Sequence, residues 1–295
     1  MTTSWLRIIA RSPLPESAAL LGEGLLASGG SAVEERDGAV VSYLALTDRT
    51  AAEAEEHVRA AVRGVLGGDA VEFEFDEVPE EDWLALWRSG LEPRRMGRIV
   101  VAPTWSAVDA GGDDIVIRID PQMAFGTGEH ATTRGVLRLM QQAVEPGARV
   151  LDVGAGSAIL AIAAARLGAA SARAVENDPD AMDNAAENVQ RNGVEEAVSL
   201  HCEHVDGAYL ARMGDGAFDG ILANVLSGVL RPLLPAFHRS LRPGGWAILS
   251  GILRDEARGM REAAVASGFI VEAEDAEDEW WSVLLRRPLS GHERT

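Results

Sequence analysis

The segment Val150-Leu-Asp-Val-Gly-Ala-Gly-Ser-Ala contains the residues best suited to hold a small molecule. Its apolar first half predicts a buried strand, and Gly154 and Gly156 predict a turn in which the backbone can approach a ligand closely. The alanine-rich residues 157–167 that follow predict a helix. In doubly wound sheets ligands bind beyond the carboxyl ends of the strands, and this turn would lie there.

Glu176 ends the next predicted strand, where its carboxylate can accept hydrogen bonds from both hydroxyls of an adenosine ribose. A dinucleotide would need a third glycine, which lets the helix pack near the pyrophosphate, but Ile159 takes that position. S-adenosylmethionine has no pyrophosphate, and Asp152 suits this cofactor either by contacting its methionine part or by ordering the turn. The pattern therefore favours a class I methyltransferase over a nicotinamide-dependent dehydrogenase.

Asn224 follows a third predicted strand, residues 218–223, and would face the group that is transferred. Its amide oxygen can accept a hydrogen bond from a substrate amine and direct the nitrogen lone pair at a methyl carbon. The alternative is structural, because an asparagine here can cap the following helix. We favour the catalytic role because of the neighbouring glycine turn.

The loop Met123-Ala-Phe-Gly-Thr-Gly-Glu-His-Ala-Thr-Thr is a second dense group of functional residue types. Its glycines give flexibility and its histidine is titratable. The threonine pair 132–133 has a structural alternative, which is to cap the helix predicted over residues 132–143. We expect the loop to cover the cofactor, with contacts from Phe125, Thr127, Gly128, His130 and Thr133.

All 27 basic residues are arginine, and no lysine occurs in the 295 residues. A lysine-free chain cannot use a P-loop lysine, a Schiff base or the lysine–glutamate pair of kinases. With 46 acidic residues the net charge is −19, which argues against direct nucleic-acid binding and so against an RNA methyltransferase. The charge suits a cationic partner or simply a soluble protein, and the missing lysine fits the codon usage of a GC-rich genome.

Cys202 is the only cysteine, so the chain can form no internal disulfide, which is typical of a reducing compartment. The first residues lack a signal-peptide pattern, and no run of about 18 apolar residues predicts a transmembrane helix. The six histidines and the cysteine lack the spacing of metal ligands. We therefore expect a cytoplasmic monomer that binds neither a membrane nor a metal ion.

Residues 1–78 alternate short elements in the order βαββαβ, which is typical of a small ferredoxin-like α+β domain. A linker helix region is predicted over residues 79–98. Residues 69–82 contain eight acids and no base, and this run is either a solvated face or a docking surface for a basic protein. Strands are predicted at residues 5–10, 33–35, 40–46 and 71–75, and helices at residues 17–27 and 51–66.

Residues 99–295 are predicted to form the catalytic domain. Strands alternate with helices there, which predicts an α/β fold with a parallel, doubly wound, Rossmann-like sheet. Two strands near residues 268–272 and 280–285 are expected to close the sheet. The other strands are predicted at residues 99–101, 149–153, 172–176, 218–223 and 246–250, and the helices at residues 132–143, 157–167, 180–192 and 230–240.

Several segments together resemble the signature of the PrmA family, the methyltransferases of ribosomal protein L11. The loop Ala-Phe-Gly-Thr-Gly with its Thr-Thr pair is far more specific than the glycine turn. The resemblance covers residues 80–285 by motif, and the N-terminal part by the order of its elements. The matching segments are residues 120–133, 151–164, 178–192, 223–226 and 249–253.

The resemblance implies transfer of methyl groups from S-adenosylmethionine to lysine side chains and to the N-terminal α-amine of that basic ribosomal protein, with repeated transfers. It implies that the ferredoxin-like domain recognises the substrate and that the linker lets the catalytic domain reposition. Cofactor contacts are implied for Thr133, Gly154, Glu176 and Asn224. The family usually has Gly, Cys, Gly and Asp where this chain has Gln122, Ala155, Ala158 and Glu176.

The predicted reaction is an in-line displacement at a sulfonium methyl, which requires an amine that has lost its proton. Lysine has a pKa of about 10.4 and an α-amine a pKa of about 8, and desolvation would lower both. Glu129 and His130 are candidates to assist the removal of the proton. Two alternatives stay open: a methyltransferase that acts on another protein or a small amine, and a non-catalytic cofactor-binding protein of the same fold.

Overall fold

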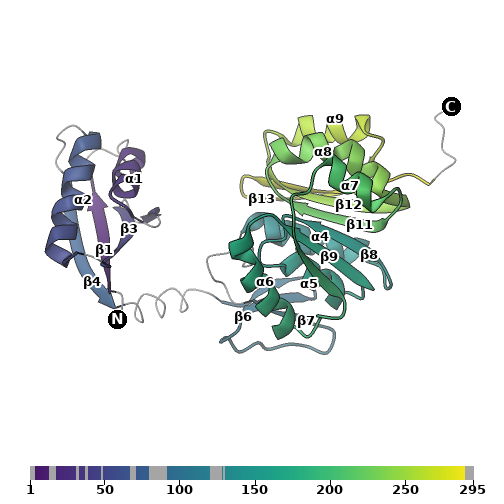
Figure 1. Ribbon diagram of the computed structural model, residues 1–295, viewed down its shortest axis with the longest axis horizontal. Coiled ribbons are helices and arrows are strands. Elements are labelled where there is room, and N and C mark those ends of the chain that lie inside the picture. The colour runs from purple at the N-terminus through teal and green to yellow at the C-terminus, as the bar shows by residue number, and fades with distance from the viewer. Residues whose placement is uncertain are drawn as a thin grey trace. The chain divides into compact units, whose positions relative to one another are not determined.

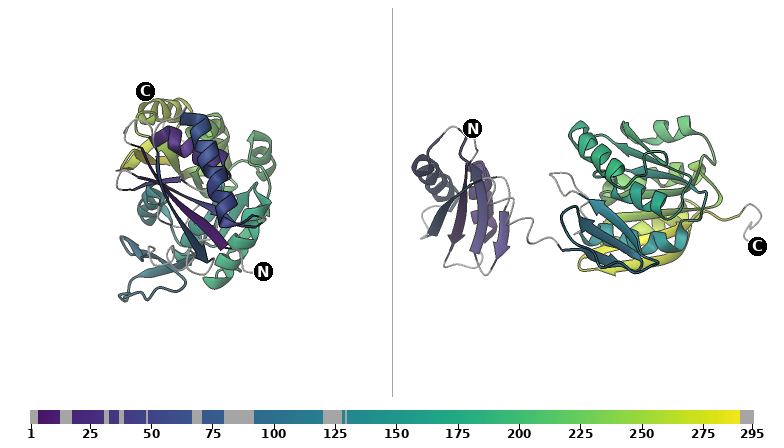
Figure 2. Two further views of the ribbon diagram at one scale, coloured as in Figure 1. Left: turned by 90° about the vertical axis from the view of Figure 1, so that its left-hand side faces the viewer. Right: turned by 90° about the horizontal axis from the view of Figure 1, so that it is seen from below.

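The computed structural model describes two compact units, which divide between Leu91 and Glu92 (Figures 1 and 2). The residues that it describes are 4–12, 18–30, 33–36, 39–47, 49–66, 71–79, 92–119, 128 and 130–289. None of the described helices is both long and apolar enough to span a membrane.

The first unit has the predicted element order and forms one antiparallel sheet in the strand order β2-β3-β1-β4, as in ferredoxin-like folds. Alternation along β1 buries Leu6 and Ile8 in a core with Leu25 of α1 and Val58 of α2, so both helices cover the same face of the sheet. The elements are β1 (Ser4–Arg11), α1 (Ala18–Ala27), β2 (Val33–Arg36), β3 (Ala39–Ala45), α2 (Ala51–Leu66) and β4 (Glu72–Pro79).

Two acids of the predicted acidic run are paired with arginines of the neighbouring strand. Arg7 Nη2 lies 2.5 Å from Asp76 Oδ2, and Arg11 Nη1 lies 2.5 Å from Glu74 Oε1. The hydrogen bond to Asp76 raises the pKa of Arg7. Glu72 and Glu77 are exposed, whereas residues 69, 80, 81 and 82 lie outside the described residues. The run is therefore partly neutralised along β4.

The division of the chain differs from the predicted boundaries at residues 78 and 98. β4 continues to Pro79, and β5 (Arg94–Met96) pairs with β6 (Ile99–Pro103) inside the second unit. The cause is local, because a turn at residues 97–98 folds β5 back onto β6. The predicted linker helix falls mainly on residues 80–91, which lie outside the described residues.

The second unit is built on a seven-stranded sheet in the order β10-β9-β8-β11-β12-β14-β13. Pairing is parallel from β10 to β12, but β14 runs antiparallel to both of its neighbours, so the sheet is parallel-rich and not wholly parallel. Its strands are β8 (Arg149–Val153), β9 (Ser171–Glu176), β10 (Val198–Cys202), β11 (Phe218–Asn224), β12 (Leu241–Leu253), β13 (Ile270–Glu277) and β14 (Trp280–Arg286).

Helices cover both faces of this sheet, as expected for a doubly wound fold (Figure 1). Successive residues of β8 show the two layers: Val150 packs in the core with the first three helices, and Leu151 packs in the core with the last three. The first three are α4 (Ala131–Ala143), α5 (Ile159–Arg166) and α6 (Pro179–Arg191), and the last three are α7 (Gly207–Met213), α8 (Ser227–Ser240) and α9 (Ala257–Ala266).

Five elements were not predicted from the sequence: β5, β10, α7, α9 and β7 (Ile115–Ile119), which is parallel to β6 in a separate three-stranded sheet. β10 is a half-exposed edge strand and α7 has seven residues, so neither shows a clear repeat of apolar residues in the sequence. The strand expected at residues 246–250 is longer, because β12 includes an irregularity where its pairing with β11 shifts.

Candidate active site

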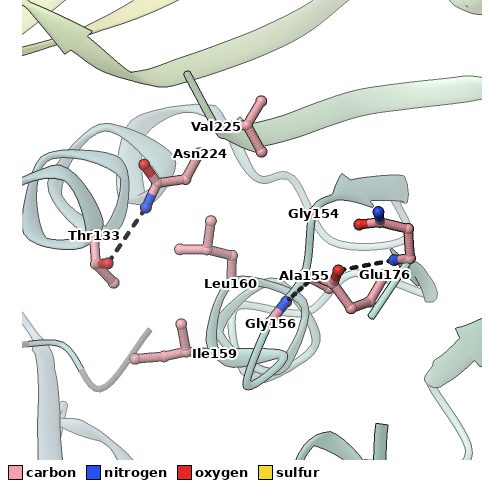
Figure 3. Close-up of a pocket in the computed structure, with 10 residues that line it drawn as sticks. Thr133, Gly154, Ala155, Gly156, Ile159, Leu160, Glu176, Asn224 and Val225 are labelled. Carbon is pink, nitrogen blue, oxygen red and sulfur yellow. Dashed lines mark hydrogen bonds between the residues drawn. The ribbon is translucent and has the colours of Figure 1, made fainter. Parts of the chain in front are cut away.

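A pocket of about 230 Å³ lies at the carboxyl edge of the seven-stranded sheet, over the ends of β8, β9 and β11 (Figure 3). Five of its lining residues are ones that the sequence singled out, because parallel strands bring their carboxyl ends to one edge. The other five were not predicted as contacts of S-adenosylmethionine, and each is apolar or directly follows a predicted site residue. The lining residues are Thr133, Gly154, Ala155, Gly156, Ile159, Leu160, Glu176, Asn177, Asn224 and Val225.

The glycine turn is held by β11 on one side and by β9 on the other. Gly154 has a φ of 68°, and a Cβ there would lie 2.6 Å from Cγ1 of Val225, so the position requires glycine. Glu176 Oε2 accepts a hydrogen bond from the Gly156 N–H at 2.8 Å. The carboxylate of Glu176 therefore fixes the turn to the end of β9.

Glu176 also accepts hydrogen bonds at its other oxygen. Oε1 accepts from the N–H of Asn177 at 2.8 Å and from the N–H of Asp178 at 3.0 Å. A carboxylate offers about four acceptor sites, so these three bonds leave roughly one for a ribose hydroxyl. The predicted acceptance of both ribose hydroxyls would require Glu176 to exchange one of its backbone bonds.

Asp152 lies behind the turn, fully buried, and does not line the pocket. Its Oδ2 accepts a hydrogen bond from the Ala161 N–H in the first turn of α5 at 3.0 Å, and its Oδ1 has no partner among the described residues. Burial raises the pKa of Asp152 to about 7, against the lowering by the Ala161 bond, and the charge of Glu176 adds to the rise. Of the two predicted roles, the structure shows the ordering of the turn.

The same arrangement disfavours a dinucleotide. A pyrophosphate would bind at the N-terminus of α5, but the carboxyl group of Asp152 already accepts one of the N–H groups there. Ile159, at the start of the helix, is buried and fills the space that a glycine would leave. The site therefore fits a nucleoside without phosphates.

Asn224 lies beside Thr133 in the pocket, away from Glu176 (Figure 3). Its Nδ2 donates a hydrogen bond to Thr133 Oγ1 at 3.4 Å. The following helix begins at Ser227 with Leu226 as its N-cap and has no side-chain cap, so the structural alternative for Asn224 is wrong. The bond to Thr133 commits the amide nitrogen, and Oδ1 is the atom left to accept a hydrogen bond from a substrate.

The loop before α4 is described only at two of its predicted site residues. Gly128 has a φ of 86°, and a Cβ there would lie 2.9 Å from Cγ1 of Val101, which places it against β6. His130 is the N-cap of α4, with Nδ1 2.7 Å from Thr132 Oγ1, so the histidine makes the cap that was the structural alternative for the threonines. Neither residue is among those that line the pocket, and Phe125, Thr127 and Glu129 lie outside the described residues.

Buried asparagines lie four residues apart on α6 and at its C-cap, and they contact elements next to the turn. Asn188 Nδ2 donates to the carbonyl of Ser157 at 3.3 Å and to Asn184 Oδ1 at 3.2 Å. Asn192 bonds to both backbone groups of Arg118 in β7, at 2.8 and 2.7 Å. The signal in the sequence is the i, i+4 spacing of asparagines on the face of the helix that should be apolar.

A family model for ribosomal protein L11 methyltransferase (PrmA) matches residues 23–288. This chain belongs to the PrmA family. A ribosomal protein L11 methyltransferase of Pelotomaculum thermopropionicum is 36% identical over 96% of this chain and 98% of its own length. One from Symbiobacterium thermophilum is 41% identical over 72% of this chain and 68% of its own. A crystal structure of ribosomal protein L11 methylase from Lactobacillus delbrueckii subsp. bulgaricus is 31% identical, with a TM-score of 0.59, and covers 67% of this chain and 99% of its own.

Membership in the PrmA family makes this chain a protein methyltransferase that uses S-adenosylmethionine, as the sequence predicted. The cofactor supplies an electrophilic methyl group. The pocket fits it, because Gly154 and Gly156 line the pocket with backbone, Glu176 retains acceptor capacity and no phosphate site is present among the described residues. Glu176 and the turn would hold the nucleoside, and Asn224 and Thr133 would face the other end.

Proposed function

We propose that this PrmA-family enzyme methylates amines of ribosomal protein L11, namely lysine side chains and the N-terminal α-amine, and transfers more than one methyl group to the same nitrogen. The observation that carries the proposal is the Asn224–Thr133 pair in the pocket, which leaves one amide oxygen to receive an amine. The names of the relatives support the choice of substrate.

Asn224 orients the acceptor nitrogen. An ammonium ion has no lone pair, so the amine reacts only after losing a proton. Oδ1 of Asn224 accepts an N–H of the neutral amine and thereby fixes the direction of the lone pair. A carboxylate at this position would stabilise the ammonium form and raise the pKa of the amine, whereas the uncharged amide does not.

In this proposal the two domains have different roles. The ferredoxin-like domain, which contains β1 to β4, recognises ribosomal protein L11, and the linker that follows it lets the catalytic domain, which begins at Glu92, reach several amines. The net charge of −19 supports a basic protein partner rather than a nucleic acid. The enzyme acts as a monomer in the cytoplasm, where its substrate is made.

The experiment is a methylation assay with free ribosomal protein L11 and S-adenosylmethionine, read by intact mass. The proposal expects a series of species that differ by single methyl groups. Transfer only to another protein or to a small amine would replace the substrate in this proposal. Calorimetric binding of the cofactor without transfer to any ribosomal protein would overturn it in favour of a non-catalytic protein.

A further inference from the structure

The acceptor amine has to reach Asn224 from the side that the cofactor pocket leaves open. The pocket extends from β11 towards β8 and β9, and on the other side of β11 the sheet continues with β12 and β14. Asn224 is in register with Ser250 of β12, and Leu253 of β12 is in register with Trp280 of β14. The ends of β12 and β14 are therefore the part of the sheet edge next to the reacting group.

Contacts tie these strand ends to the helices on both faces of the sheet. Glu256 Oε1 accepts a hydrogen bond from Ser227 Oγ at 2.7 Å, and its Oε2 accepts from the Leu253 N–H at 3.3 Å, which joins the start of α8 to the end of β12. On the other face, the ring of Trp280 lies edge-on to His130 at the start of α4, with centroids 5.0 Å apart. Asn224 in turn bonds to Thr133 of α4. These contacts therefore connect β11, α4, β14, β12 and α8 in a ring at this edge of the sheet.

Apolar side chains are exposed along this ring. Leu226, next to the pocket residue Val225, is 69% exposed, Val229 is 46% exposed and Leu253 is 38% exposed. We call these three residues and the partly buried Trp280 the acceptor rim. Exposed apolar groups gathered beside a reactive group mark a binding surface, and tryptophan often dominates the binding energy of such surfaces.

The turns beside the acceptor rim are acidic. Asp255 follows the end of β12, and Asp278 and Glu279 form the tip of the β13–β14 hairpin; all three are exposed and, within the described residues, none has an ion-pair partner. One basic residue, Arg254, lies between Leu253 and Asp255 in the chain, so these turns contain more acids than bases. A partner that fits this surface carries positive charge together with an apolar side chain.

We propose that the acceptor rim binds the substrate segment that carries the target amine, and that this is a basic protein segment with an apolar side chain beside the methylated residue. The inference rests on the proposed function and adds how the enzyme selects among amines. Packing of the apolar side chain against the rim removes water from the neighbouring ammonium group, which lowers its pKa and favours the neutral form that Asn224 receives. The exposed carboxylates attract the segment before it docks.

The test compares V229S/L253S with a matched control, V265S/I270S. Val265 on α9 is 40% exposed and Ile270, at the opposite end of the hairpin, is 56% exposed, so the control removes similar exposed surface away from the rim. We expect the rim variant to raise KM for ribosomal protein L11 about tenfold and to lower kcat at neutral pH, because less of the bound amine is neutral, with the Kd for S-adenosylmethionine unchanged. The control should match the wild type in all three.

A second pair tests the charges. D278N/E279Q should raise KM about threefold at low salt and reduce its dependence on salt, whereas E195Q/E196Q, which alters two exposed acids before β10, should do neither. A crosslinker attached to L253C in a C202S background should capture ribosomal protein L11, and one attached to V265C should not. This measurement needs no turnover, so it holds even where a serine variant folds poorly.

The outcomes separate the two proposals. If the wild type methylates ribosomal protein L11 but the rim and control variants behave alike in KM and in crosslinking, the acceptor rim is overturned and the proposed function stands. If the wild type transfers no methyl group to ribosomal protein L11, the proposed function fails and the rim falls with it. Selective loss in the rim variants supports both.

Discussion

Asn224 and Thr133 share one hydrogen bond, and the proposed orientation of the acceptor amine depends on it. Replacement of Asn224 by alanine removes the oxygen that orients the amine while the glycine turn and Glu176 keep the nucleoside site. We expect kcat to fall about 100-fold and the Kd for S-adenosylmethionine to change by less than about threefold. Single-turnover methylation and calorimetry measure the two quantities. Near-normal turnover in Asn224→Ala would refute the orienting role.

Glu176 holds the turn, and its proposed second role is to bind the nucleoside of the cofactor. Glu176→Gln replaces one acceptor oxygen by an NH2 group that must face a backbone N–H, so at least one of the three backbone bonds is lost. We expect a loss of about 1–3 kcal/mol in cofactor binding, or a rise in Kd of about tenfold or more. Calorimetric titration measures it, with the exposed Glu195→Gln as the control. Equal Kd values in the two variants would contradict this role.

At the scale of elements, Asp152 couples β8 to the start of α5. Its pKa is about 7 in the folded chain and 3.8 for an ordinary solvated aspartate, so between these values the folded chain holds a proton that the unfolded chain has lost. The free energy of unfolding therefore falls as the pH rises from about 4 to 7, by up to about 1.4 kcal/mol per pH unit from this group. The stabilising protonation is fully present below about pH 4 and is lost above about pH 7.

Asp152→Asn removes this titration and keeps an oxygen for the Ala161 N–H. We expect the variant to gain stability relative to the wild type as the pH rises from about 5 to about 7. Unfolding of the full chain without cofactor, followed by calorimetry at several pH values, measures the difference. A difference that does not vary with pH would show that Asp152 does not titrate in this range.

At the scale of the whole molecule, charge is the property that bears on function. Residues 1–92 contain 7 arginines and 18 acids, so the N-terminal part is the more acidic per residue. We expect the Kd for ribosomal protein L11 to rise with added salt, because screening weakens attraction between an acidic surface and a basic partner. Binding at several salt concentrations tests this. An affinity independent of salt would leave the acidity with a role in solubility alone.

The sequence by itself determined the class of fold and which polar residues lie together at the pocket. The apolar residues of most strands and helices in the second unit recur with a clear spacing. The glycine turn, Glu176 and Asn224 each stand where a strand ends, at one edge of the sheet. Strand order then follows from the class of fold, so residues far apart in the chain were correctly expected to meet. Short edge elements such as β10 and α7 were missed because few residues carry their period.

Only the tertiary structure decided what each polar group bonds to. The sequence left open whether Asp152 contacts a ligand or orders the turn, and its burial and its bond to the Ala161 N–H show the ordering role. It also left open whether Asn224 caps a helix, and α8 begins after Leu226 without a side-chain cap. The structural alternative for the threonine pair, a helix cap, was wrong, since His130 is the N-cap of α4. Hydrogen-bond partners depend on distances between elements that are remote in the chain, and no local pattern of residue types contains those distances.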